Sequence, residues 1–112
     1  MSRIILSRHA DGEPRLIAGW DRPLRSAFVT LYDDEGEVMA DRGPMVGERL
    51  TSLDAVDAVV AFDGEGLGLG IDPTAVAMTR LLHLLQAHEA LEYPSSNVQV
   101  DLTGDADFAP VR

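Results

Sequence analysis

The side chains of this sequence best suited to proton transfer or metal binding near neutral pH are its three histidines. His83 and His88 are five residues apart, so on one helix they would differ by about 140° around its axis. A helical zinc-binding pair needs a spacing of four residues on one face, so we do not expect these two histidines to share a metal. His88 falls on the buried side of its predicted helix, where a hydrogen-bonded histidine near the C-terminal end is the simplest interpretation.

A glycine-rich segment and several acidic residues could also bind ions. Residues 64–70 contain four glycines, and glycines let backbone amides approach a phosphate. However, no lysine follows the segment, and Glu65 would repel phosphate. The spacing of Asp63, Glu65 and Asp72 matches no calcium-binding loop. We therefore predict no metal, no cofactor and no catalytic residues.

Trp20 is the single tryptophan of the chain, and it lies beside Arg22 and Arg25. A rigid aromatic ring next to guanidinium groups is typical of the residues that dominate binding energy at interfaces. We predict that Trp20, Arg22 and Arg25 form a partner-binding patch. In the alternative interpretation Trp20 packs in the core, and both arginines pair with surface acids.

The N-terminal run I-I-L-S-R-H-A, residues 4–10, is an apolar strand that leads into Arg8 and His9. Together with the later Asp-Arg-Pro-Leu at 21–24, it resembles the nucleophile box of histidine phosphatases. The resemblance implies that His9 is the phosphate-accepting nucleophile and Arg8 its phosphate clamp. The second histidine and acid of that family have no counterpart here. A phosphatase-like or other hydrolytic enzyme is thus the alternative function.

A second resemblance covers more of the chain. The motif Gly-Trp-Asp-Arg-Pro-Leu at 19–24, followed by 28–33 and 50–60, is similar to small uncharacterised bacterial proteins with a glycine-aromatic-Asp-x-Pro-Leu strand and turn. This resemblance implies paired strands followed by helices and carries no activity with it.

Short segments rich in β-branched and aromatic residues indicate strands. Arg15–Trp20 and Ser26–Tyr32 flank Pro23, which fits a connection because it cannot donate to a ladder. The polar run at 33–37 predicts a hairpin into a third strand at 38–40, followed by a loop over 41–49. A further strand is expected within 97–103. In the second strand, the residues predicted to face the core are Ala27, Val29 and Leu31.

Two helices are expected after the strands. The first begins at Thr51 or Ser52, and the alternative is a hairpin of 58–62 with 67–71. The second runs from Pro73 to Glu92 with Asp72 as its cap. The predicted buried residues are Leu53, Val56, Val59, Val60 and Phe62 in the first helix, and Ala77, Met78, Leu81, Leu84, Leu85 and Leu91 in the second.

Composition limits the class of protein. A chain of 112 residues is expected to form one domain, 1–112, with a loosely held tail at 105–112. No cysteine is present, which excludes disulfides and thiolate chemistry. The formal net charge of -10, with all nine basic side chains being arginine, argues against direct nucleic-acid binding. Neither a membrane span nor a secretion signal is recognisable, so a cytoplasmic protein is expected.

The sequence therefore predicts an α+β fold, an antiparallel sheet of three or four strands with two helices packed on one face. The predicted function is a small acidic, non-catalytic interaction or regulatory module that binds a protein partner. Exposed sheet edges also make a homodimer an expectation. A further alternative is an acidic mimic of nucleic acid.

Overall fold

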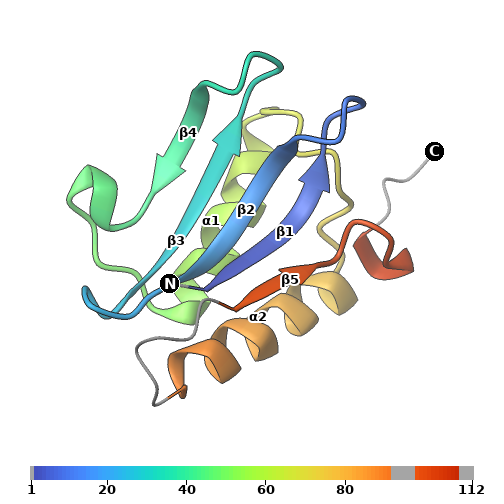
Figure 1. The fold of residues 1–112 in the computed structure, drawn as a ribbon. Coiled ribbons are helices and arrows are strands. Elements are labelled where there is room, and N and C mark those ends of the chain that lie inside the picture. Colours follow the sequence, from blue (N-terminus) through green and yellow to red (C-terminus); the bar gives the residue numbers. More distant parts are fainter. Residues whose placement is uncertain (1, 92–97, 109–112) are drawn as a thin grey trace.

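The structure is a computed structural model that describes residues 2–91 and 98–108. A meander of four strands comes first, followed by two helices and a short last strand (Figure 1). The predicted loop at 41–49 in fact begins with the end of the fourth strand and contains a short 3₁₀ turn. In chain order the elements are β1 (Arg3–Arg8), β2 (Pro14–Asp21), β3 (Ser26–Tyr32), β4 (Val38–Arg42), η1 (Pro44–Val46), α1 (Ser52–Gly64), α2 (Ala75–Glu89), β5 (Gln99–Asp101) and η2 (Ala106–Phe108).

The sheet has the strand order β4-β3-β2-β1-β5. The first four strands are antiparallel, whereas β5 is parallel to β1, with Ile4 opposite Val100. The prediction of an antiparallel sheet of three or four strands is therefore wrong: the sheet is mixed and has five strands. The reason lies in β1, whose consecutive residues Ile4, Ile5 and Leu6 are all buried. A strand buried on both faces is an inner strand, and β5, arriving after the helical crossover, supplies its second neighbour.

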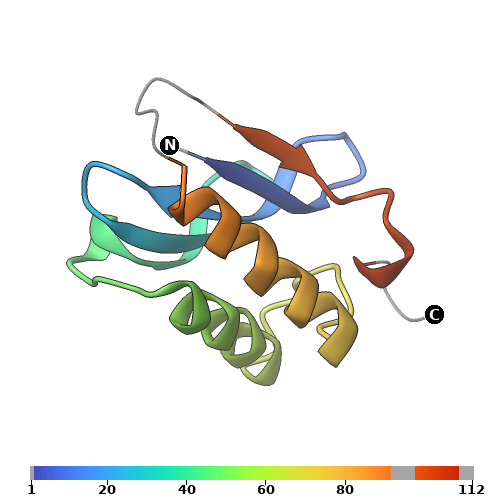
Figure 2. The same cartoon turned by 90° about the horizontal axis from the view of Figure 1, so that it is seen from below.

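Both helices cover the same face of the sheet, as Figure 2 shows from below. The α+β class and the placement of two helices on one face are thus as predicted. The residues of β3 expected to face the core are indeed buried. The core between sheet and helices includes Leu16, Ala18, Ala27, Val29 and Leu31 from the strands and Ala55, Val59, Leu81 and Leu85 from the helices.

Helix α1 begins where the sequence predicts, because Thr51 forms a capping box with Asp54. The Thr51 hydroxyl accepts from the Asp54 amide, and the Asp54 carboxylate accepts from the Thr51 amide, both at 3.0 Å. The alternative hairpin is excluded. Leu53 and Val60, predicted to be buried, are about half exposed. The buried face instead carries small residues, which allow close packing: Ser52, Ala55 and Ala58, together with Val56, Val59 and Phe62.

Helix α2 begins at Ala75, two residues later than predicted. Its cap is Thr74 and not Asp72, because the Thr74 hydroxyl accepts from the amide of Ala77 at 3.2 Å. Leu91, predicted to be buried, lies exposed beyond the end of the helix. The predicted end at Glu92 lies outside the described residues.

The chain end after β5 contributes Phe108 to the core, where its side chain is 2% exposed. Residues 109–112 lie outside the described part of the structure, so the loosely held tail at 105–112 stays a prediction. Among the described residues, no helix combines the length and the hydropathy that a membrane-spanning helix would need.

Candidate binding site at the β2–β3 turn

A cavity of about 550 Å³ opens beside the turn that joins β2 to β3. This volume lies within the range typical of ligand sites. The three residues of the predicted patch all line it, so the structure brings them together around one cavity. Sequence reasoning missed the residues contributed by the segment before α1 and by the last turn of α2. The lining consists of Trp20, Arg22, Arg25, Arg49, Leu50, Thr51 and Glu89.

Arg25 adopts an unusual backbone conformation at the end of this turn. Its φ is 49°, and among the described residues it is the only residue other than glycine with positive φ. For an L-residue the left-handed region costs about 1–2 kcal/mol, which glycine would avoid. Such strain concentrates at functional sites. Arg25 thus occupies a turn position where glycine would be less strained.

Hydrogen bonds hold the cavity wall in place. The Nε of Arg49 donates to the carbonyl of Arg25 at 3.2 Å. The amide of Leu50 donates to the Ser26 hydroxyl at 2.8 Å, and the Ala27 amide donates to the Leu50 carbonyl at 2.8 Å. The segment before α1 is thereby fixed beside the start of β3. A site whose walls are already ordered loses little conformational entropy on binding.

Positive charge collects at this cavity in an otherwise acidic chain. Arg8, Arg42 and Arg80 each form an ion pair. Within residues 2–91 and 98–108, no ion pair involves Arg22, Arg25 or Arg49. The alternative interpretation, in which Arg22 and Arg25 pair with surface acids, finds no support in this part of the chain. The one carboxylate in the lining, Glu89, accepts from the Ser52 hydroxyl at 3.2 Å.

Trp20 lines the cavity and also packs in the core, where it is 7% exposed. Thus the ring does not project as an exposed anchor.

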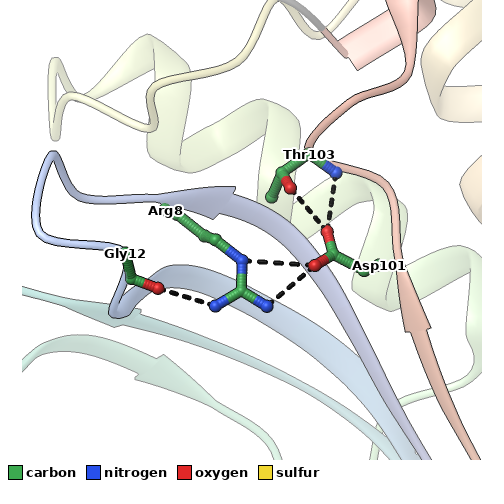
Figure 3. A network of polar contacts seen from close by, with 4 residues as sticks. All are labelled: Arg8, Gly12, Asp101 and Thr103. Carbon is green, nitrogen blue, oxygen red and sulfur yellow. Dashed lines mark hydrogen bonds and ion pairs between the residues drawn. The ribbon is translucent and has the colours of Figure 1, made fainter.

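Arg8 and His9, the pair singled out by the phosphatase resemblance, point to different parts of the sheet. The Arg8 guanidinium donates to Asp101 of β5 and to the carbonyl of Gly12 (Figure 3). The His9 side chain is 8% exposed, with Nδ1 3.0 Å from Asp34 in the β3–β4 hairpin. His9 Nε2 is buried and has no hydrogen-bond partner among the described residues. Arg8 is therefore engaged elsewhere and does not frame a phosphate site with His9.

The other two histidines are separated as the sequence predicts. His88 lies on the buried face of α2, and burial lowers its pKa below the ordinary 6.5. His83 is exposed. Within the part of the chain that the structure describes, no three histidine or acidic side chains are placed to hold a metal ion.

Comparisons of the chain with protein family models, curated proteins and solved structures find no match. The lining of the cavity contains no histidine, and its one hydroxyl, on Thr51, caps α1. The three guanidinium groups of the lining can bind an anion.

Proposed function

We propose that this chain is a small non-catalytic module that binds a protein partner at the cavity beside the β2–β3 turn. One observation carries the proposal. Arg22, Arg25 and Arg49 converge on one cavity, and none of them has an ion-pair partner among the described residues. Arginine is among the residues most enriched where binding energy concentrates.

The overall charge favours a protein over a nucleic acid as the partner. A chain with a formal net charge of -10 repels a phosphate backbone along most of its surface. A local group of arginines can still attract a local anionic group on a folded or extended protein, because charges closer than the Debye length of about 8 Å are only partly screened at physiological salt.

The experiment compares capture of proteins from a lysate of the source cells by three forms of the chain. One is the natural chain, the second carries Arg22→Gln and Arg25→Gly, and the third carries Arg3→Gln. Arg3 is exposed and lines a different cavity with Ile17 and Tyr32, so its replacement removes one positive charge, against two in the double variant, without altering the site. We expect a specific partner that the double variant loses and the Arg3→Gln variant keeps. Identical captures by all three forms would rule the site out.

A hydrolytic function that uses His9 is a second proposal, since its Nδ1 lies 3.0 Å from Asp34 Oδ1 and accepts a hydrogen bond from Arg15 Nε at 3.3 Å. A carboxylate can orient an imidazole for proton transfer. Turnover of a generic phosphate ester that disappears in His9→Ala would support it. The absence of turnover across simple phosphoesters would remove it.

A further inference from the structure

We infer that the cavity beside the β2–β3 turn recognises paired carboxylates, as presented by consecutive Asp or Glu side chains of an extended peptide segment. This inference rests on the proposed binding function and specifies the chemistry of the partner.

The donor groups in the cavity match carboxylates. Each guanidinium presents a planar fork of N–H donors that can bind a planar carboxylate through two parallel hydrogen bonds. The side chains of Arg22 and Arg25 make no hydrogen bond within the described residues, and Arg49 uses its Nε for the Arg25 carbonyl. The terminal nitrogens of all three arginines are thus available to a ligand.

The start of α1 offers less to a phosphate than an uncapped helix start would. A phosphate site commonly uses the free amides and the positive end of a helix. Here the amides of Thr51 and Asp54 are already bonded within the capping box. The amide and the hydroxyl of Thr51 lower the pKa of Asp54, so this carboxylate stays ionised at the helix start. It offsets the positive end of α1, so this helix end adds little attraction for a phosphate.

The charge and size of the cavity call for two carboxylates and not one. Three guanidinium groups and the carboxylate of Glu89 leave two positive charges unbalanced. A cavity of about 550 Å³ also exceeds what a single carboxylate group fills. Leu24, which lies between Arg22 and Arg25 in the chain, is 56% exposed.

The test uses a synthetic capped peptide with three consecutive glutamates between glycines, and a matched peptide with three glutamines. Binding is measured by isothermal titration calorimetry and by the fluorescence of Trp20, the single tryptophan, which lines the cavity. We expect the glutamate peptide to bind saturably and the glutamine peptide not to bind. Arg22→Gln and Arg25→Gly should each weaken binding by at least about tenfold, and Arg3→Gln should leave it unchanged.

Other results would overturn the inference. These are equal binding of both peptides, tighter binding of inorganic phosphate than of the glutamate peptide, or binding that is insensitive to Arg25→Gly. Sedimentation equilibrium tests whether the occupant is a second copy, whose acidic hairpin at 33–37 could enter the cavity. If the chain self-associates and Arg25→Gly abolishes this self-association, the occupant of the cavity is the hairpin of a second copy and not a peptide of another protein. If no peptide binds but capture from the lysate still depends on Arg25, the proposal of partner binding at this cavity is supported and the inference of carboxylate recognition is wrong.

Discussion

Arg8 at the end of β1 binds Asp101 at the end of β5 through two hydrogen bonds to the same carboxylate oxygen (Figure 3). Arg8 Nε and Nη2 lie 3.2 and 2.8 Å from Asp101 Oδ2, while Asp101 Oδ1 accepts from the hydroxyl and the amide of Thr103. The Thr103 hydrogen bonds, followed by that from Arg8, lower the pKa of Asp101 from 3.8 to about 2. This contact ties together the only parallel pair of strands in the described sheet.

The Asp101 contacts predict acid sensitivity. Because the pKa of Asp101 is lower in the folded state, the stabilisation is present above about pH 4 and is lost as pH falls toward 2. We expect Asp101→Asn to reduce the free energy of unfolding at pH 7 by about 1 kcal/mol, since the pair is partly exposed to solvent. The difference should shrink at pH 2.5. Urea denaturation at both pH values measures it, with the exposed Asp57→Asn as control. A difference that is the same at both pH values would contradict the assignment.

Gly19 in β2 is required by close packing on the face of the sheet opposite the helices. A Cβ at this position would overlap the carbonyl oxygen of Ser2 and lie 2.7 Å from Cζ of Phe28. We expect Gly19→Ala to lower the free energy of unfolding by at least about 2 kcal/mol. In Gly64→Ala, at the end of α1, the new methyl meets open space and should change stability by no more than about 1 kcal/mol. Thermal unfolding followed by circular dichroism tests both, and similar losses in the two variants would refute the packing argument.

Because Arg25 has a positive φ, two substitutions at this position should differ in their effect on stability and agree in their effect on binding. Arg25→Gly relieves the backbone strain while it removes the guanidinium, so its free energy of unfolding should stay within about 1 kcal/mol of the natural chain. Arg25→Val also removes the guanidinium but puts a β-branched residue in the left-handed region, and should be less stable than Arg25→Gly by about 1–2 kcal/mol. Both variants should bind the glutamate peptide equally weakly. Urea denaturation with calorimetry checks this, and a glycine variant as unstable as the valine variant would count against the strain.

The parts of the fold predicted from sequence are those set by local signals. Alternation placed Ala27, Val29 and Leu31 on the core face of β3, and the side chains around Thr51 marked the start of α1. Both of these signals come from residues that are close together in the sequence. The helix wheel was less reliable, because burial of α1 follows its small residues and leaves Leu53 exposed.

What the sequence could not supply are contacts between distant segments. The pairing of β5 with β1 depends on a helical crossover, for which no local pattern exists. Arg49 reaches the cavity only because Leu50 bridges to Ala27 in β3, and Glu89 arrives from the far end of α2. The sequence predicts a patch of Trp20, Arg22 and Arg25, but it does not predict that distant segments complete a cavity around these residues.

His88 makes the chain sensitive to mild acid. Its side chain is 7% exposed, its Nδ1 has no partner among the described residues, and burial lowers its pKa below the ordinary 6.5. The unfolded chain therefore binds more protons than the folded chain as pH falls through 6.5, so the free energy of unfolding decreases in that range. We expect His88→Leu to reduce the difference between urea denaturation at pH 7.5 and pH 5.5, because leucine does not titrate. The exposed His83→Ala should keep the full difference. If His83→Ala and not His88→Leu flattened the profile, the buried histidine would not be the group that responds to pH.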